Sequence, residues 1–529
     1  MAKKLFFVIS PLSFLFVWWL STHEAGLIHL GWFALAYTLI GIHDLYSHHN
    51  ILRNYPFIGH FRYMLEYIRP EIQQYFIENN SDGRPFSREQ RSVAYQRAKN
   101  VTDTLPFGTQ QKILEEGYEY ALHSLAPVEV DENEARIMVG NEQCTQPYSA
   151  SRLNISAMSF GALGHTAIEA LNWGAKMGNF YHNTGEGGLS PYHLKHGGDI
   201  VLQIGTANFG FRNKDGSFNP EKFKQKAELP QVKMIEIKIS QGAKPSHGGL
   251  LPGAKVGPEI AEIRDIEVGQ DCFSPAKHPS VNTPLELVHF IKQLRELSNG
   301  KPVGFKLCIG NKKEFFGICK AMLETKIYPD FITIDGAEGG TGAAPLEFSN
   351  RLGLTLNEGL SFVHNALAGI GIREHVRLIA SGKVVSGFDL LCKFALGADI
   401  CNSARAMMFS VGCIQARSCN TNHCPTGIAT QDPARTSAVV PEVKRFRVKN
   451  FHDNTIKACF ELMGAMGISV PNQLKPSHIH MRMQDSTSIT YRDYYPHLST
   501  NALIQPTECN ERERKYFLAD WDEASAEHF

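Results

Sequence analysis

Eight short apolar segments, separated by helical stretches, constrain the fold of this chain most strongly. They cover residues 153–159, 178–184, 199–205, 233–240, 302–309, 330–336, 376–382 and 399–405. Most are typical of strands and end in glycine or polar residues, and amphipathic segments such as 284–298 follow several of them. Strands that alternate with helices predict parallel pairing through crossover helices, and eight such units predict a closed (β/α)8 barrel of the TIM type. A doubly wound open sheet is the alternative.

Two apolar stretches lie near the N-terminus, at residues 3–20 and 27–45. Each has about the length needed to cross a hydrocarbon core of roughly 30 Å. Lys3 and Lys4 precede the pair and Arg53 and Arg62 follow it, so the positive charge flanks both outer ends. This pattern predicts a transmembrane hairpin over residues 1–50, with both ends and the catalytic body in the cytoplasm. A signal peptide and a buried helical pair are the alternatives.

The remaining chain divides into three further segments by composition. Residues 51–149 read as a helical connector, 150–465 as the barrel and 466–529 as a polar C-terminal extension. The formal net charge is zero, which gives no electrostatic case for a nucleic-acid partner. No G-x-G-x-x-G motif follows a strand, so a built-in nicotinamide-binding domain is not indicated.

A group of polar residues follows the fourth predicted strand. Lys238 shares a strand face with Glu236 by alternation, and a lysine that faces a barrel interior needs an anion. Gln241, Lys244 and Arg264 follow within a short distance. Two ammonium groups and a guanidinium suit a dicarboxylate ligand, because the guanidinium binds one carboxylate through two hydrogen bonds. Structural ion pairing is the alternative interpretation.

The last two predicted strands end in "ASGKVVSG" and "NSARAM", where (β/α)8 barrels commonly bind phosphate. Gly382 permits a close approach of the backbone, and Lys383 or Arg405 would add charge. Lys306, at the end of the fifth strand, is positioned to lie against a flavin ring. Glycine loops at 185–188 and 336–345 would wrap a planar cofactor, and each contains an acid, Glu186 or Glu338.

Three cysteines, Cys413, Cys419 and Cys424, follow the eighth strand, and a proline comes directly after the last one. In a reducing compartment such thiols are more often metal ligands or catalytic groups than disulfides. Three thiolates without a clear fourth ligand fit a [3Fe–4S] cluster. A zinc site with His423 as the fourth ligand and unliganded thiols are the alternatives.

Five motifs between residues 150 and 465 resemble the synthase domain of glutamate synthase, an FMN-binding (β/α)8 barrel. They are "SAMSFGAL", "NTGEGG", "IKISQGAKPSHGGLLPGAKV", "GAEGGTGAAP" and "GCIQARSCNTNHCPTGIATQDP". The resemblance is strongest to the short, stand-alone, membrane-associated members of this FMN-binding family. It implies that Cys413, Cys419 and Cys424 ligate a [3Fe–4S] cluster.

The resemblance also implies a set of roles for the residues of the barrel rim. Lys238, Gln241, Lys244 and Arg264 would contact 2-oxoglutarate, and Glu186 and Lys238 would be catalytic. FMN would be bound by Met158, Ser159, Gln203, Lys306, Gly339, Gly340, Ser381, Gly382, Lys383, Ala404 and Arg405.

The implied activity is the reductive amination of 2-oxoglutarate with ammonia to give L-glutamate. Electrons would come from an external donor, such as a ferredoxin or a reductase subunit, and pass through the cluster to FMN. The chain has no room for the glutaminase domain of the large enzymes, so ammonia would be free or come from a separate glutaminase. Membrane lipid would contact the hairpin.

The sequence departs from the large enzymes at Ser246 and His247, where they carry a glycine and an acid. Two other functions stay open, and this difference bears on the first. One is an FMN and [3Fe–4S] oxidoreductase that acts on a different imine or oxo acid, as an N-alkyl amino acid synthase does. The other is a non-catalytic membrane scaffold.

Overall fold

The computed structural model describes residues 2–101, 104–485, 487–506 and 509–529. They form two compact units, Met1–Arg88 and Glu89–Phe529. The finer division into hairpin, connector, barrel and extension stays a prediction.

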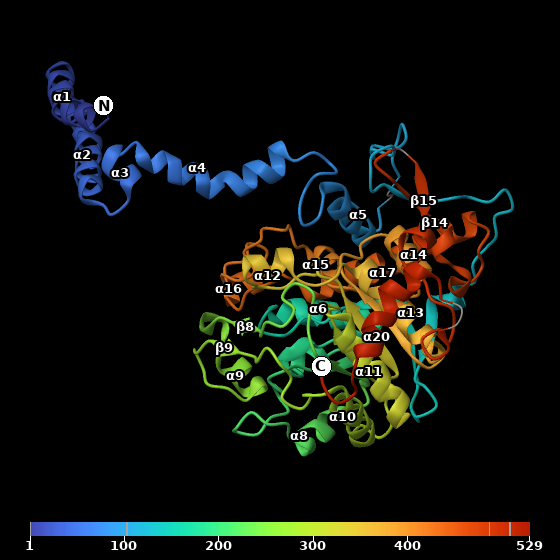
Figure 1. Ribbon diagram of the computed structural model, residues 1–529. Coiled ribbons are helices and arrows are strands. Elements are labelled where there is room, and N and C mark those ends of the chain that lie inside the picture. The colour runs from blue at the N-terminus through green and yellow to red at the C-terminus, as the bar shows by residue number, and fades with distance from the viewer. Residues whose placement is uncertain (1, 102–103, 486, 507–508) are drawn as a thin grey trace. The chain divides into compact units, whose positions relative to one another are not determined.

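The second unit contains a closed barrel of parallel strands (Figure 1). In chain order its strands are β4 (Leu153–Ile155), β5 (His182–Asn183), β6 (Ile200–Ile204), β7 (Val232–Lys238), β10 (Val303–Leu307), β11 (Phe331–Asp335), β12 (Arg377–Ser381) and β13 (Ile400–Ser403). The last strand pairs with the first, with Asn402 opposite Asn154, and this pairing closes the sheet. Each predicted strand segment overlaps one barrel strand, so the predicted barrel is confirmed and the open sheet is excluded.

Helices cover the outside of the barrel. The longer ones are α6 (His165–Gly178), α8 (Pro220–Ala227), α10 (Pro284–Leu297), α11 (Lys312–Thr325), α13 (Leu356–Gly369), α14 (Gly387–Ala395) and α17 (Pro441–Ala465). Side chains satisfy the free N–H groups at several helix starts: Thr283 accepts from Glu286 N before α10, and Ser386 forms a reciprocal cap with Asp389 before α14. Gly174 of α6 faces Val448 of α17, and a side chain there would collide with it.

A β-hairpin closes the N-terminal end of the barrel. Its strands are β2 (Arg136–Val139) and β3 (Tyr148–Ser151). Val139, Tyr148 and Ala150 pack in one buried cluster with barrel residues that include Met234 and Phe331. This end is therefore filled with apolar side chains, and ligand chemistry is left to the opposite rim.

The C-terminal residues pack against the same unit. β1 (Glu119–Ala121), β14 (Ile479–Arg482) and β15 (Ser488–Thr490) form a small antiparallel sheet. The final segment, which includes α20 (Ala519–Glu523), lies on α11: Lys320 Nζ donates to Ala524 O at 2.7 Å, and Trp521 contacts Phe316 edge to face. The remaining short helices of this unit are α5 (Arg88–Lys99), α7 (Pro191–Leu194), α9 (Pro258–Arg264), α12 (Leu346–Arg351), α15 (Arg405–Val411), α16 (Pro433–Thr436), α18 (Tyr491–Tyr494) and α19 (Glu511–Glu513).

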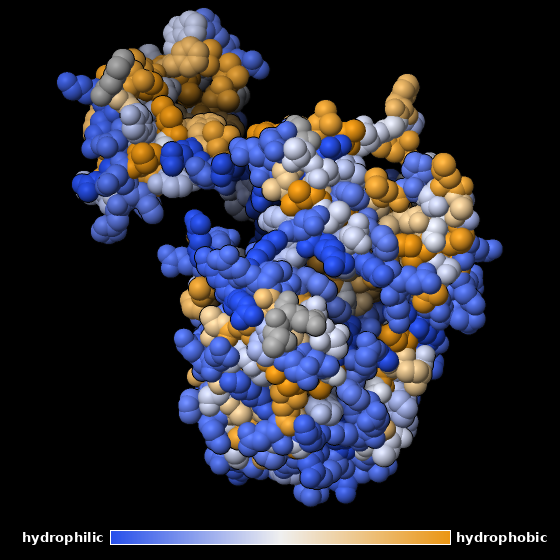
Figure 2. Space-filling model, turned by 45° about the vertical axis from the view of Figure 1, so that its right-hand side comes forward, coloured by the Kyte–Doolittle hydropathy of each residue, from blue (hydrophilic) through white to orange (hydrophobic). Residues whose placement is uncertain are grey.

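The first unit is helical. It contains α1 (Ala2–His23), a 3-10 turn (Ala25–Leu30), α2 (Gly31–Tyr46), α3 (Asn50–Asn54), α4 (Gly59–Ile72) and a π-turn (Gln73–Ile77). Ala2–His23 and Ala25–Tyr46 are long and apolar enough to cross a membrane by length and composition, a test that a signal sequence also passes. Only 17% and 11% of their most apolar windows are buried, which argues against a packed pair of soluble core helices. Figure 2 shows the broad apolar surface that results on this unit.

Candidate active site

The predicted site residues gather at the C-terminal ends of the barrel strands. Lys238 is the last residue of β7, Ser381 is the last residue of β12, and Lys306 lies one residue before the end of β10. Glu186 lies in a 3-10 turn (Gly185–Gly187) directly after β5. Parallel strands all end at one rim of a barrel, so residues far apart in the sequence meet there.

An ion pair lies at the centre of this rim. Lys238 Nζ is 3.0 Å from Glu186 Oε1 and also donates to Gln241 Oε1. Burial raises the pKa of Glu186, but Lys238, Lys244 and Arg264 outweigh it and lower that pKa to about 2. Glu186 is therefore ionised at neutral pH and accepts hydrogen bonds without donating a proton.

Two more cations complete the cluster, and both are buried. Lys244 Nζ donates to Ala343 O at 3.1 Å; burial lowers its pKa, which Glu186 partly restores. Arg264 Nη2 donates to Phe160 O at 3.0 Å, and its Nε has no hydrogen-bond partner among the described residues. The structure thus brings together the whole predicted set of Glu186, Lys238, Gln241, Lys244 and Arg264.

A short antiparallel pair of strands, not predicted from the sequence, lies beside this cluster. Its strands are β8 (Leu250–Leu251) and β9 (Cys272–Phe273). Ser274 Oγ lies 3.4 Å from Glu186 Oε2, and Cys272 Sγ lies 3.6 Å from Arg264 Nη1. Gly249 has space for no side chain, because a Cβ would come within 2.9 Å of Glu186 Oε1.

A second buried ion pair lies on the neighbouring strands β10 and β11. Lys306 Nζ is 3.2 Å from Asp335 Oδ2. Burial opposes the charge of Lys306, but Asp335 and Glu236 together raise its pKa. Asp335 also accepts from Gly242 N at 2.9 Å, which fixes the loop after β7. Lys306 is therefore a permanent cation in the barrel mouth.

Glu236 is the centre of a hydrogen-bond network among the inward-facing residues. Its carboxylate accepts from Asn183 Nδ2 at 2.8 Å, Gln203 Nε2 at 2.7 Å and Thr333 Oγ1 at 2.6 Å. These donors lie on three other strands, so Glu236 ties the barrel together and fixes the side chain of Gln203. The alternation of Glu236 with Lys238 was the only sequence signal for this network.

The residues predicted to bind FMN line the remaining part of the rim. Ser159 Oγ lies 3.5 Å from Arg264 Nη2, and the preceding Met158 lies against Gly185, where a Cβ would collide with its backbone. Arg405 Nη2 donates to Glu338 O at 2.9 Å, and its side chain occupies the space beside Gly340. Gly339 follows Glu338 in the same loop.

The loops after β12 and β13 are neighbours, since Ser381 pairs with Asn402. Gly382 has φ +147°, and a Cβ there would lie in van der Waals contact with Gly336 N and Leu356, each 3.5 Å away. Lys383 has φ 48°, in the left-handed region. Ala404 and Arg405 begin α15 beside this bend. Such a bend beside a helix start exposes backbone N–H groups and is suited to a phosphate.

The three cysteines lie in one loop between α15 and α16. Burial raises the pKa of Cys413 to about 12, and the neighbouring thiols of Cys419 and Cys424 contribute to this rise. Burial also raises the pKa of Cys424, but hydrogen bonds from Thr426, Ala429 and Ile428 lower it below its usual value. Thiolate stabilisation of this kind is what a metal-ligating sulfur needs.

Across residues 2–101, 104–485, 487–506 and 509–529, no group of three or more His, Cys, Asp or Glu side chains is arranged around one metal ion. His423 is exposed. The zinc alternative, which needs four ligands about one point, therefore receives no support, and the [3Fe–4S] cluster on Cys413, Cys419 and Cys424 stays a prediction.

The cysteine loop is attached to the loop that follows β4. Gln431 Nε2 donates to Gly161 O at 3.0 Å and Leu163 O at 2.9 Å. The buried Lys255 donates to Cys419 O at 2.8 Å and Ala429 O at 2.9 Å. Lys255 was not identified from the sequence, since its neighbours in "LLPGAKV" carry no sign of a long-range contact.

The chain is similar to several known proteins. The family described as the conserved region in glutamate synthase matches residues 94–469. The glutamate synthase large subunit-like protein YerD of Bacillus subtilis (strain 168) is 38% identical over 482 residues, which are 83% of this chain and 91% of that protein. The archaeal-type glutamate synthase [NADPH] of Dehalococcoides mccartyi is 31% identical over 330 residues, 62% of each protein. Among solved structures, mandelate oxidase with (S)-2-phenylpropionate is 14% identical with a TM-score of 0.40, over 74% of this chain and 98% of that one.

Proposed function

The chain belongs to the glutamate synthase family and is an oxidoreductase, and we propose that it converts 2-oxoglutarate and ammonia to L-glutamate at the rim of the barrel. The observation that carries this proposal is the cation cluster of Lys238, Lys244 and Arg264 around Glu186. Three positive charges and one carboxylate leave two positive charges, which match the two carboxylates of 2-oxoglutarate.

Arg264 is the group best suited to the first carboxylate of the substrate. It is buried, its Nε has no partner among the described residues, and a guanidinium recognises a carboxylate through two hydrogen bonds. Lys244 would hold the second carboxylate. Fixing both ends of the substrate orients its C2 carbon, which is the proximity contribution to the rate.

Glu186 and Lys238 would act on the nitrogen. Because the pKa of Glu186 is about 2, its carboxylate is ionised and can hold an ammonium ion or an imine N–H by accepting hydrogen bonds. Lys238 carries the proton of this pair and would donate a hydrogen bond to the group at C2. The oxo group of 2-oxoglutarate leaves as water when ammonia forms the imine at C2. Two electrons and two protons then reduce this imine to the amine of L-glutamate.

FMN fits the part of the rim that these residues leave. Met158, Ser159, Gln203 and Lys306 would contact the ring, with Gly339 and Gly340 beside it, and the bend at Ser381–Lys383 with Ala404 and Arg405 would hold the phosphate. The positive φ of Gly382, which a glycine adopts without strain, and the permanent charge of Lys306 support this assignment. When bound, the flavin would supply the hydride that reduces the imine carbon.

A [3Fe–4S] cluster would be held by Cys413, Cys419 and Cys424. The donor set supports it: three thiols lie in one loop, and Cys424 already accepts hydrogen bonds from several backbone N–H groups. Such a cluster would deliver electrons one at a time to the flavin. The chain's own contribution is the anchoring of this loop by Lys255 and Gln431.

The external partners follow from this chemistry. Electrons would come from a ferredoxin or a reductase subunit, and ammonia would be free or come from a separate glutaminase. The two apolar helices would anchor the chain in a membrane, with the barrel on the cytoplasmic side.

One observation favours a different imine substrate. His247, in the loop that follows β7, packs edge to face on Phe348 of α12 with ring centroids 4.9 Å apart. An aromatic pair at this rim would suit a substrate that carries an N-alkyl group. The same oxidoreductase would then act as an N-alkyl amino acid synthase.

Spectroscopy of the whole protein tests both candidates. The protein is purified anaerobically in detergent, reduced with one equivalent of dithionite per flavin, and mixed with 2-oxoglutarate, ammonium or methylammonium. Reoxidation of the flavin only with 2-oxoglutarate and ammonium together supports glutamate formation. Faster reoxidation with methylammonium supports the N-alkyl candidate, and indifference to all three compounds excludes both.

A further inference from the structure

We propose that α4 and the turn after it, residues 59–76, lie in the plane of a phospholipid membrane surface with their apolar face among the acyl chains. This inference rests on the proposed membrane hairpin and adds a second membrane contact, which follows that hairpin in the chain.

The sequence of α4 is amphipathic. Apolar residues recur every three or four positions, at Phe61, Met64, Leu65, Ile68 and Ile72, and the same spacing continues to Tyr75 and Phe76. Arg62, Glu66 and Arg69 lie together along one edge of this stripe. An apolar stripe of this kind belongs against a protein core or in a membrane interface.

No protein core covers this stripe within the described residues of its own unit. Gly59 is the one buried residue of α4. The side chains of Phe61, Leu65 and Phe76 are 55%, 54% and 84% exposed. An apolar patch of this extent on a soluble surface marks an interaction site.

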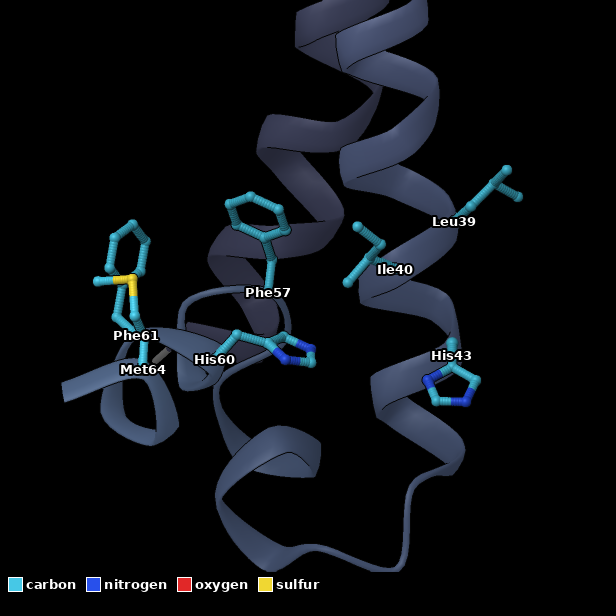
Figure 3. Close-up of a pocket in the computed structure, with 7 residues that line it drawn as sticks. All are labelled: Leu39, Ile40, His43, Phe57, His60, Phe61 and Met64. Atoms are coloured by element: carbon cyan, nitrogen blue, oxygen red, sulfur yellow. The ribbon is translucent and has the colours of Figure 1, made fainter. Parts of the chain in front are cut away.

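The apolar surface of α4 continues onto α2, and this continuity identifies the partner as lipid. A groove of about 620 Å³ is lined by Leu39, Ile40 and His43 of α2 and by Phe57, His60, Phe61 and Met64. Figure 3 shows Ile40, Phe57 and His60 between α2 and the start of α4, with Phe61 and Met64 on the α4 side. Since α2 is the second candidate span, the medium that surrounds it also reaches this groove.

A buried aspartate fixes where α4 begins. Asp44, near the end of α2, is fully buried and accepts hydrogen bonds from His60 Nε2 at 2.9 Å and Phe57 N at 2.8 Å. α4 is thereby held at the end of the candidate span, where acyl chains meet headgroups. In Figure 1 α4 runs across the direction of α1 and α2, as a helix in the membrane plane would.

The charges of α4 indicate which lipid is needed. Arg62 and Arg69 are balanced by Glu66 and Glu71, and Arg62 Nη2 lies 3.7 Å from Glu66 Oε1. The helix therefore has no net attraction to anionic headgroups. Its binding would come from apolar burial and would occur on zwitterionic phosphatidylcholine.

The test is photolabelling of the full chain in phosphatidylcholine vesicles with a lipid-soluble diazirine, mapped by mass spectrometry. We expect label on Phe61, Leu65, Ile68 and Phe76, and at least threefold less on Arg62, Glu66 and Arg69. Adding 30% phosphatidylglycerol should change this pattern less than twofold. Label in residues 2–46 but none in 59–76 would overturn the inference and leave the hairpin intact, and label on neither would also contradict the hairpin.

Two substitutions on neighbouring positions provide a matched pair. Leu65→Lys places a charge on the apolar face and should lower the labelling of α4 at least threefold. Glu66→Lys places the same charge on the polar face and should leave it unchanged. Leu65 and Glu66 are both exposed, so neither substitution disturbs a packed core. Unchanged labelling of α2 in each variant will show that the hairpin is still inserted in the membrane. If the apolar face is covered by a second copy of the chain, the label will be absent from α4 and cross-linked dimers will form, which excludes the lipid assignment.

Discussion

The side chains of Lys238 and Glu186 form an ion pair, with Nζ 3.0 Å from Oε1, that joins the end of β7 to the loop following β5. β6 lies between β5 and β7 in the barrel, and its Gln203 donates to Glu236 in the hydrogen-bond network of the barrel interior. The pair therefore connects the proposed substrate cluster to the rigid barrel wall.

Replacing Lys238 with methionine should lower kcat/KM for 2-oxoglutarate roughly 100-fold, because one charged hydrogen bond and the ionised partner of Glu186 are lost (about 3 kcal/mol). The measurement is steady-state glutamate formation under anaerobic conditions. Lys233→Met on the same strand is the control, since Lys233 is half-exposed and lies away from the rim. Equal activity of the two variants would contradict a role of Lys238 in substrate binding or catalysis.

Acid should destabilise the protein through Glu186. Its folded-state pKa, about 2, is below the ordinary value, so the stabilisation is present above pH 5 and is lost as the pH falls toward 2. The expected loss from this one group is about 3 kcal/mol in full, and about 2 kcal/mol of it falls between pH 6 and pH 3. Urea unfolding of the wild type and Glu186→Gln at pH 6 and pH 3 measures it. The variant should lose less stability on acidification, and identical losses would show that Glu186 titrates normally.

Substituting serine for Cys419 should remove the proposed cluster while the flavin remains. Iron and acid-labile sulfide per chain should fall to near zero, and the flavin absorbance should stay within about a fifth of the wild-type value. Cys144→Ser is the control, because Cys144 lies outside the loop and its thiol contacts Gly300 O. Wild-type iron content in the Cys419 variant would contradict the assignment.

Alanine at Gly382 should weaken flavin binding. The residue has φ +147°, where a Cβ adds strain of about 1–3 kcal/mol, and it lies in the bend that we propose to hold the phosphate. Flavin retained after gel filtration should fall at least threefold. Gly310→Ala is the matched control, since its Cβ would meet no atom within 4 Å and its backbone is not strained. Equal retention in both variants would argue against a phosphate at this bend.

Local pattern was sufficient to predict the barrel, since strand composition and the helices between strands are encoded within about ten residues. The polar strand ends also predicted the rim, and Glu186, Lys238, Lys244 and Arg264 do meet there. The strands are shorter than predicted: β5 covers only His182–Asn183 of the segment 178–184, because the chain leaves the sheet to form the glycine loop.

Contacts between distant segments could not be predicted in this way. Asp335 pairs with Lys306 across strands, and Ser274 contacts Glu186 from the residue after β9, a strand of only two residues. Neither residue has a local signature of its role. The C-terminal residues appeared polar, yet Phe517, Ala524 and Ala526 are buried, because a segment need bury only one side on an existing core.

The loop after β4 limits how this enzyme can be redesigned. Phe160 O accepts from Arg264, and the next residue, Gly161, accepts from Gln431 of the cysteine segment. Adjacent carbonyls thus hold the proposed substrate pocket on one side and the proposed electron entry on the other. Insertions here would move both at once, so libraries for altered substrate range should vary the His247 and Phe348 loops and keep the length of residues 159–163 constant.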